Sequence, residues 1–498
     1  MSTPTQSTKQ LWAGVAKVDV TGSATDQIDD PLYAAVDAAR GRDRLYVRAL
    51  VMRDATTTAV LVTVDAVAIA EIGSIGNDYL ANVRASLRQD PGIVAGHVII
   101  NASHCHGVVC ADVESRTVQA VREAFRGQVP VTVGVGRGHE DRISENRRLQ
   151  LHNGREADVR RAYSLPADEQ VAAVGPVDPE IGILRLDRLD GDTLALVYNF
   201  ACHPIQGVPD GGNTADLSGF ASQVIEEGLG EGAIALFVQG CAADINPILY
   251  RDVDNPADAE PLGQRLGLST LQAARKIRGM AAAQVKVIAD SIALPKADLL
   301  PHIEALEAEQ SRLLQALAPT SLNLKSFVPL LIKHSLSPEY PSFDSHRYLH
   351  EQRMGSQHLR QLDDVNRRLL DQYTKNIHTM EQLTRVGVNL GLLRLHHARN
   401  EAHAGATVDA EVTGIKIGPF ALLTFAGELP VTMGLHLKRA SPHEYTFIAG
   451  VTNGYLYYTP TAEQLKNRGG AQEDSDCFVA PEWQRLFEDK ALEILSQI

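Results

Sequence analysis

Two histidines separated by one residue give the clearest indication of chemistry in this sequence. His104 and His106 lie in residues 101–107, directly after the apolar run 97–101. A buried strand that ends in such a pair would place imidazoles at the mouth of a cleft, where their nitrogens could bind Zn²⁺. The same spacing also occurs among ordinary polar residues, so the pair alone leaves both interpretations open.

Further polar side chains follow apolar runs elsewhere in the chain. They are His203 after residues 193–200, Glu428 after residues 421–425, and Tyr455 and Tyr458 after residues 447–451. Each has a simpler interpretation, as a capped core histidine, an acid at a helix start or a packed aromatic cluster. Strand ends at one edge of an α/β sheet converge, however, and two histidines, a glutamate and a phenolate there could form an open zinc site.

The elements that would position these residues alternate between strands and helices. The pattern predicts one hairpin from residues 46–52 and 59–64 and a second from residues 181–186 and 193–200. Further strands are predicted at 97–101, 129–135, 234–239, 412–417 and 421–425, and helices at 72–87, 117–125, 216–229, 261–280 and 481–495. This alternation predicts the α/β class.

Residues 299–404 differ from the rest, because they are rich in Leu, Gln, Arg and His and have helical periodicity at 301–317 and 346–397. We interpret them as a helical insertion in a domain formed by residues 1–298 and 405–498. An apolar patch, residues 327–332, separates the two helical runs. The insertion could be a covering layer or oligomer face, or a lid that shapes the substrate pocket.

Composition excludes several classes of protein. The 498 residues carry 47 Lys and Arg against 61 Asp and Glu, a net charge of −14, which disfavours nucleic-acid binding and docking on anionic membranes. Five cysteines are few for this length and their number is odd, whereas a secreted disulfide framework normally has a denser, even set. Neither a signal peptide nor a transmembrane run of about 18 apolar residues is present. We therefore expect a cytoplasmic protein that acts on a small molecule, without membrane insertion, and a homo-oligomer is possible.

Taken in order, the blocks resemble the neutral/alkaline (non-lysosomal) ceramidases and their bacterial relatives. Seven blocks follow that family's order: residues 12–21, 101–107, 200–204, 216–219, 237–247, 427–428 and 453–458. The resemblance implies a mixed-sheet catalytic domain and a zinc-dependent hydrolase of amide bonds. It places the zinc ligands at His104, His203, Glu428 and Tyr458.

The same resemblance implies roles for neighbouring residues. Tyr458 is preferred to Tyr455 as ligand because it is the second Tyr of an N-x-Y-x-x-Y pattern that starts at Asn453. His106 falls on the second His of the family's pair, and Arg147 falls on an arginine that contacts substrate. We expect His106 to move protons, because imidazole titrates near neutral pH.

Several family features are absent, and they decide the expected substrate. No G-x-S-x-A-A-G stretch occurs between residues 285 and 407, Gly469 or Gly470 stands where a second Tyr is expected, and no C-terminal sandwich domain follows. We therefore predict a zinc hydrolase that uses activated water on an amide, ester or lactone of a soluble metabolite, rather than a true ceramidase. A metal-dependent lyase or isomerase on a sugar-like or hydroxy acid substrate, or a non-catalytic metabolite-binding protein, remains open.

Overall fold

The computed structural model describes residues 10–23, 37–41, 43–159, 166–207, 212–230, 232–248, 258–281, 283–341 and 344–498. Residues 1–9, on which the expectation about a signal peptide depends, lie outside these ranges. Among the described helices, none has both the length and the apolar character needed to cross a membrane.

The largest element is an eight-stranded mixed sheet with the order β14-β12-β11-β6-β1-β3-β4-β5. Its strands are β1 Leu11–Asp19, β3 Tyr46–Arg53, β4 Thr58–Val64, β5 Val98–Ala102, β6 Val129–His139, β11 Glu180–Arg188, β12 Thr193–Phe200 and β14 Ile234–Gln239. Two pairs, β4–β5 and β12–β14, are parallel, and the other neighbours are antiparallel. Both predicted hairpins are therefore confirmed, as β3–β4 and β11–β12.

A four-stranded sheet, with the order β16-β17-β18-β19, packs face to face on the first sheet. It consists of β16 Val285–Pro295, β17 Thr407–Ile417, β18 Phe420–Phe425 and β19 Tyr445–Ala449. One buried cluster joins the two sheets and includes Leu184 and Leu236 from the first sheet and Ile415 and Leu422 from the second. The main core therefore lies between the sheets.

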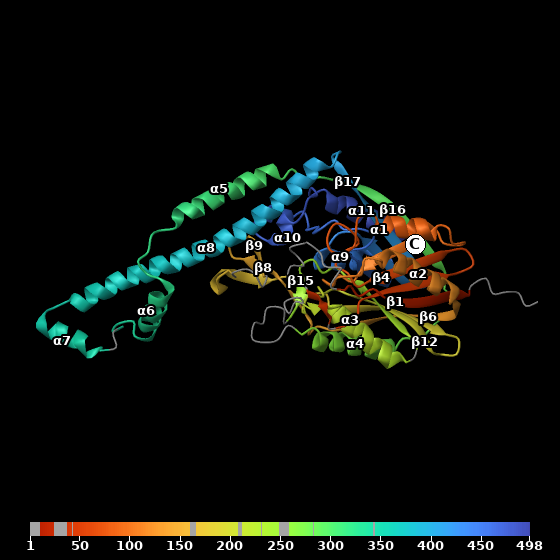
Figure 1. Cartoon of the computed structure of the whole chain (residues 1–498), viewed down its shortest axis with the longest axis horizontal. Helices are drawn as coiled ribbons and strands as arrows, with labels where there is room; N and C mark the ends of the chain where they lie inside the picture. Colours follow the sequence, from red (N-terminus) through yellow and green to blue (C-terminus); the bar gives the residue numbers. More distant parts are fainter. Residues whose placement is uncertain are drawn as a thin grey trace, which may run out of the picture.

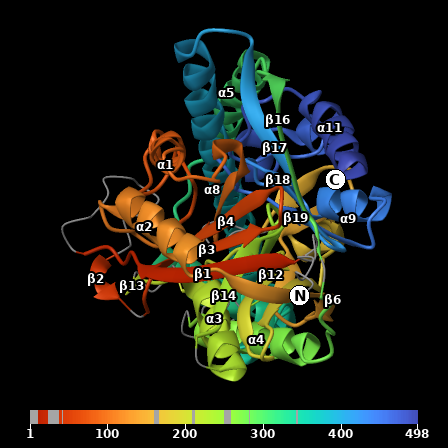
Figure 2. The same cartoon turned by 90° about the vertical axis from the view of Figure 1, so that its right-hand side faces the viewer.

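Helices cover the outer faces of both sheets, which makes a four-layer α/β arrangement (Figure 2). The helices on the large sheet are α1 Tyr79–Leu87, α2 Val113–Arg126, α3 Asp216–Leu229 and α4 Glu260–Ala274. The small sheet is covered by α9 Val431–Ala440 and α11 Trp483–Gln497, whose Trp483 and Phe487 are fully buried. The α/β class predicted from the alternating pattern is confirmed.

Short elements lie at one edge of these layers. They are β7 Ser144–Asn146 paired with β15 Ile245–Pro247, β8 Arg148–Leu151 between β9 Glu156–Asp158 and β10 Val171–Val174, β2 Asp37–Gly41 paired with β13 Gly212–Asn213, and α10 Gln472–Ser475. Single 3₁₀ turns occur at Ala95–His97, Asp168–Gln170 and Gln464–Asn467.

Two predicted helices are shorter than the sequence pattern indicated. The first begins at Tyr79 instead of residue 72, because the preceding residues turn at Gly73, whose φ is 79°. The helix predicted over 261–280 ends at Ala274, because Met280 pairs with Val133 of β6 and draws the chain back to the sheet.

Residues 299–404 form the helices α5 Leu300–Ala316, α6 Leu324–Leu336, α7 His346–Met354 and α8 His358–Ala402. We call the two sheets and their covering helices the body. The N-terminal part of the 45-residue helix α8 extends beyond the body and, together with α6 and α7, forms a projecting arm (Figure 1). A small buried cluster holds the base of the arm and consists of Leu299, Ile303, Leu390 and Leu393.

Candidate metal centre

His104, His203 and Glu428 meet in the interior, although more than 300 residues separate the first from the last. One possible ligand atom from each lies within 4.8 Å of the others. Relative exposures are 3% for both histidines and 5% for Glu428. The structure thus brings together three of the four residues expected to bind zinc.

The strand ends converge because the two edges of the large sheet approach each other at this point. The side chain of Asn101, in β5, accepts a hydrogen bond from the backbone N–H of Gln239, in β14, at 3.0 Å. The same side chain donates to the carbonyl oxygen of Gly450, just after β19, at 2.9 Å. One buried amide therefore joins the ends of three strands, and the loops that carry His104 and Tyr458 start from two of these ends.

Both imidazoles are oriented by backbone carbonyl oxygens. The Nδ1 atom of His104 lies 2.6 Å from the oxygen of Val67, and that of His203 lies 2.9 Å from the oxygen of Ile245. A carbonyl oxygen only accepts, so each Nδ1 carries a hydrogen, and Nε2 is the nitrogen of each ring that could bind a metal ion. The Nε2 atoms lie 3.4 Å and 3.1 Å from the same oxygen, Oε2 of Glu428. This donor set suits a divalent metal ion such as zinc.

The charges in this cluster are unevenly distributed. Burial alone would raise the pKa of Glu428, but the two imidazoles hold it well below its ordinary value. Burial alone would lower the pKa of His104, but the Glu428 carboxylate raises it. Burial, with the nearby Arg147 cation, lowers the pKa of His203 to about 4. The carboxylate is therefore the most strongly stabilised charge of the three.

Several site residues have backbone conformations that non-glycine residues rarely adopt. His104 has a φ of 67°, and the loop after β19 contains Val451, Asn453 and Tyr457 at 43°, 57° and 55°. Such strained residues persist only where the surrounding structure holds them, and they concentrate at functional sites. In this loop the Asn453 side chain accepts from Ile100 N–H at 2.8 Å, which fixes the loop to β5.

The two tyrosines considered as the fourth ligand have different partners. The hydroxyl of Tyr455 donates to Oε1 of Glu428 at 2.5 Å. Burial and this carboxylate together raise the pKa of Tyr455 well above its ordinary value, so its phenol stays protonated. The hydroxyl of Tyr458 instead accepts from Nη2 of Arg147 at 3.1 Å. The assignment of Tyr458 as a metal ligand stays a prediction.

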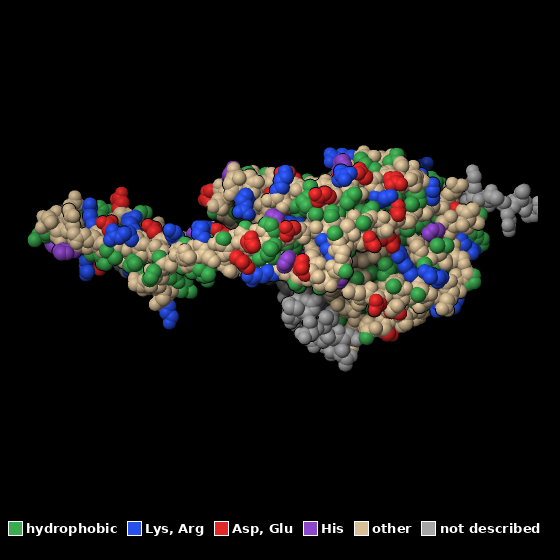
Figure 3. Space-filling view, turned by 90° about the horizontal axis from the view of Figure 1, so that it is seen from above, with side chains coloured by type: hydrophobic (Ala, Val, Ile, Leu, Met, Phe, Trp, Pro, Cys, Tyr) green, Lys and Arg blue, Asp and Glu red, His purple; other side chains and the backbone are tan. Residues whose placement is uncertain are grey.

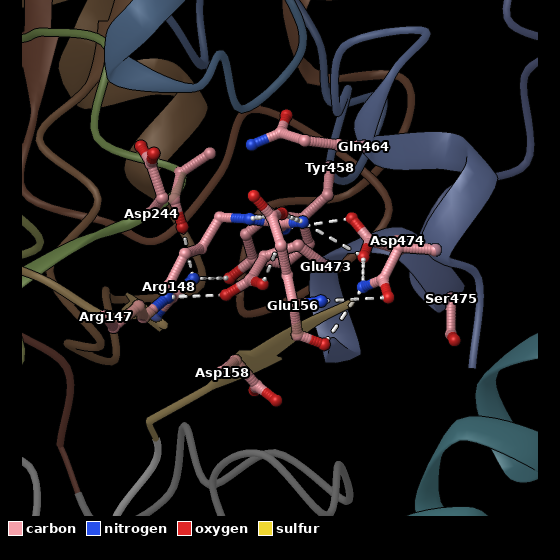
Figure 4. A network of polar contacts seen from close by, with 12 residues as sticks. Arg147, Arg148, Glu156, Asp158, Asp244, Tyr458, Gln464, Glu473, Asp474 and Ser475 are labelled. Carbon is pink, nitrogen blue, oxygen red and sulfur yellow. Dashed lines mark hydrogen bonds and ion pairs between the residues drawn. The ribbon is translucent and has the colours of Figure 1, made fainter. Parts of the chain in front are cut away.

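Arg147 is buried, and its guanidinium bonds to protein on several sides (Figure 4). Its Nε lies 2.6 Å from Glu473, its Nη1 donates to Asn246 at 3.0 Å, and its Nη2 also donates to the carbonyl oxygen of Ala243. The arrangement indicates that Arg147 holds the Tyr458 hydroxyl in place. Direct contact of Arg147 with substrate, as the resemblance implied, stays a prediction.

His106 lies beside the cluster and is half-buried, unlike the two histidines within it. Its ring centroid is 6.0 Å from that of His104, and the two rings are close to perpendicular. This position at the rim is compatible with proton transfer between the site and solvent.

Sequence reasoning missed a buried ionic network next to Arg147. Arg148 pairs with Asp474 at 2.9 Å and with Glu473 at 3.3 Å, and it also bonds to Glu156 (Figure 4). Arg148 could have been suspected because it is adjacent to Arg147. Glu473 and Asp474 carry no local signal, since an acidic pair in a polar stretch usually faces solvent.

Two glycines, Gly469 and Gly470, lie where a second family tyrosine was expected, and a Cβ atom at either would meet a neighbouring side chain. Gly469 has a φ of 86°, and a Cβ atom there would lie 2.9 Å from the side chain of Leu306 in α5. A side chain at this position would clash and strain the backbone. The positive φ and the packing of α5 on this loop therefore both favour glycine at residue 469.

The lid interpretation of the insertion stays a prediction, but the structure places its apolar patch on the arm. The apolar patch 327–332 lies in α6 on the projecting arm, where Phe327 stacks on Tyr373 of α8 at 4.4 Å (Figure 1). Three of its other side chains, Val328, Leu331 and Ile332, are 41–52% exposed, and α6 lies on the arm, away from the body (Figure 1). The C-terminal half of α8, by contrast, packs beside the site loops.

Comparison with solved structures shows the same fold in ceramidases. A crystal structure of neutral ceramidase from Pseudomonas aeruginosa is similar with a TM-score of 0.63 over 98% of this chain and 75% of that chain, at 16% identity. A ceramidase in complex with C2 is similar with a TM-score of 0.62 over 98% of this chain and 76% of that chain, at 15% identity. No known family model matches the sequence. The chain therefore has a ceramidase-like fold, which the sequence resemblance had predicted.

Proposed function

We propose that this protein is a zinc-dependent hydrolase. One observation carries the proposal: two buried histidines direct their Nε2 atoms at one oxygen of a buried glutamate. A carboxylate and two neutral imidazoles are the donor types of catalytic zinc sites, which keep a position open for reaction. The ceramidase-like fold supports a hydrolase on structural grounds.

In this proposal Tyr458 is the fourth protein ligand and Arg147 positions it. The guanidinium 3.1 Å from the phenolic oxygen is compatible with an oxygen that carries negative charge. Tyr455 orients the Glu428 carboxylate through its hydroxyl group. His106, at the rim, accepts and returns the proton. The zinc ion would supply Lewis acidity and would lower the pKa of water.

The substrate we propose is a soluble metabolite with an amide, ester or lactone bond. The sequence has no serine stretch of the family's kind, and Gly469 or Gly470 stands at the position of the second tyrosine, which argues against ceramide. We also propose a cytoplasmic location, in agreement with the sparse cysteines, which are all free and buried.

The test combines metal analysis with product analysis. The purified wild-type chain should contain about one zinc ion per chain and should hydrolyse members of a panel of amides, esters and lactones, with little release of fatty acid from ceramides. His203→Ala should lose the zinc and nearly all turnover but stay folded, because a large core does not depend on one ion. His139→Ala, which removes a 66% exposed imidazole, is the matched control and should behave as wild type.

Reaction in ¹⁸O-labelled water tests the reaction class. Hydrolysis places solvent oxygen in the product, whereas a lyase or isomerase need not. A His203→Ala variant that keeps its zinc and its turnover would overturn the assignment of the site.

A further inference from the structure

The C-terminal half of α8 contacts the loops that carry the metal centre. His396 of α8 lies 2.6 Å, through Nε2, from Oδ1 of Asp476, in the segment after α10. The ring of His396 also meets the ring of Tyr457 edge to face, with 4.7 Å between the centroids. A residue of the insertion therefore touches two segments of the catalytic body at once.

Both residues that His396 contacts are hydrogen-bonded to the backbone of a proposed metal ligand. The backbone carbonyl of Asp476 accepts the N–H of Tyr458 at 3.2 Å, and the carbonyl of Tyr457 accepts the N–H of Glu428 at 2.9 Å. A single residue, Asp476 or Tyr457, therefore links His396 to the backbone of each proposed ligand. His396 therefore contacts the two segments whose carbonyl groups accept the N–H groups of Tyr458 and Glu428.

Other side chains of the same helix brace neighbouring segments. Asn389 accepts a 2.6 Å hydrogen bond from Ser475, which precedes Asp476. Arg399 lies over the ring of Tyr457, 5.2 Å from its centroid, and pairs with Glu71 at 2.6 Å. The loop of Glu71 also contains Val67, whose carbonyl orients His104.

The chemistry at position 396 is not that of a packing residue. His396 is fully buried, and a carboxylate only accepts, so its Nε2 carries the hydrogen. Its Nδ1 has no hydrogen-bond partner within the described part of the chain, which is costly for a buried polar atom. An aliphatic residue would fill the space without this cost but would not bond to Asp476.

We propose that α8 is a positioning element of the metal centre, and that His396 is the positioning residue that holds the Tyr457–Tyr458 segment through Asp476. The base of α8 is then part of the catalytic structure, whatever the projecting end of the helix does. The zinc-affinity test of this proposal rests on the proposed function, whereas the hydrogen-exchange test of the loops does not.

The experiment compares three variants of the full chain: His396→Ala, His396→Gln and His397→Ala. Gln is the conservative variant because its amide can still donate to Asp476, and His397→Ala removes the next imidazole of the same helix. Two properties are measured: hydrogen exchange of residues 453–459 and 472–478 in metal-free protein, and zinc affinity by competition with a chelator.

We expect His396→Ala to raise exchange in both segments about 10-fold or more, as for loss of a hydrogen bond to a charged group. Zinc affinity should fall roughly 10-fold, the lower end for loss of an outer partner of a ligand. Gln should restore most of both properties, and His397→Ala should change neither. Rescue by Gln separates positioning from general destabilisation.

The proposal is overturned if His396→Ala and His397→Ala give the same exchange in these segments, or if a folded His396→Gln restores nothing. If His396→Ala does not fold, the comparison of His396→Gln with wild type and with Asp476→Ala replaces it. Absence of zinc from the wild type would reject the proposed function, while exchange in the metal-free protein would still decide the role of His396.

Discussion

At the residue scale, the different partners of Tyr455 and Tyr458 assign them different roles. Tyr455 donates to the Glu428 carboxylate, and Tyr458 accepts from Arg147. Tyr458→Phe should therefore reduce zinc affinity most, because it removes the proposed fourth ligand. Tyr455→Phe should lower zinc affinity only about 10-fold, as is usual for loss of a residue that hydrogen-bonds to a metal ligand. Chelator competition with both variants measures the order, and a larger loss in Tyr455→Phe would reverse the assignment.

Asp43 predicts a pH dependence of stability away from the metal centre. Burial raises the pKa of its carboxyl from 3.8 to about 7, although hydrogen bonds to Thr214 and Ala215 partly oppose this shift. The folded state then keeps a proton that the unfolded state releases, so this group's contribution to stability falls as pH rises from about 4 to 7.

Urea unfolding at pH 5 and pH 7.5 measures this contribution. Asp43→Asn keeps the size and an acceptor oxygen but does not titrate. Between the two pH values it should lose less stability than wild type, by on the order of 2 kcal/mol. Asp141→Asn, which changes a 61% exposed carboxylate, should match wild type. Equal losses in all three proteins would mean that Asp43 does not hold the proton.

At the element scale, close contact between the two sheets depends on Gly182 of β11. A Cβ atom there would lie 2.2 Å from the ring of Phe447, in β19. Gly182→Ala should therefore lower the free energy of unfolding by about 1–3 kcal/mol through overpacking.

A matched glycine in α8 provides the control for this prediction. A Cβ atom at Gly391 meets nothing within 4 Å, so Gly391→Ala should be neutral or should stabilise by about 0.5–1 kcal/mol. Denaturant unfolding of both variants measures the difference. A neutral Gly182→Ala would show that the sheets can separate slightly at no cost.

Elements with a strong local pattern could be predicted from the sequence. The bounds of α3, β12 and β14 agree with prediction to the residue, because a continuous apolar run or helical spacing defines each of them. The strand β16 was missed, since its sequence VKVIADSIALP mixes polar and apolar residues. The helix α6 was missed because Pro329 lies inside it, while Asn323 and Ser326 form a capping box that starts it.

The site shows the same division between local and non-local information. His104, His203 and Glu428 could be found because each follows an apolar strand. Asn101 was part of a recognised segment, but its role in joining three strand ends depends on partners more than 130 residues away. Such long-range partners have no signature in a single sequence.

At the scale of the whole molecule, the arm differs from the body in how little it buries. Exposed apolar side chains are frequent along it, as the surface of the arm in Figure 3 shows. The large ones include Leu324, Ile332, Leu336, Met354, Leu362 and Met380, each 52–79% exposed. The five buried clusters of the described chain include no side chain from residues 320–374. The body should therefore fold without the end of the arm.

A short-arm variant tests this separation between the base and the end of α8. Ala318 and Asn376 are adjacent, since the Asn376 side chain bonds to both the N–H and the carbonyl of Ala318, at 3.2 Å and 2.8 Å. Residues 320–374 can therefore be replaced by a short Gly-Ser linker that keeps α5 paired with the base of α8. The bracing residues Asn389, His396 and Arg399 all remain.

We expect the short-arm protein to keep its zinc, to keep turnover within about threefold, and to change its Tm by no more than about 4 °C, the largest shift that roughly 1 kcal/mol produces in a domain of about 150–250 residues. The reason is that all the contacts we describe between α8 and the loops of the metal centre are made by the base of the helix. Calorimetry, metal analysis and kinetics on the full and short chains check this. Loss of turnover with zinc and Tm retained would instead make the end of the arm part of substrate binding. Light scattering on the same pair shows whether the exposed apolar side chains mediate association between copies, since the short chain would then lose the concentration dependence of its mass.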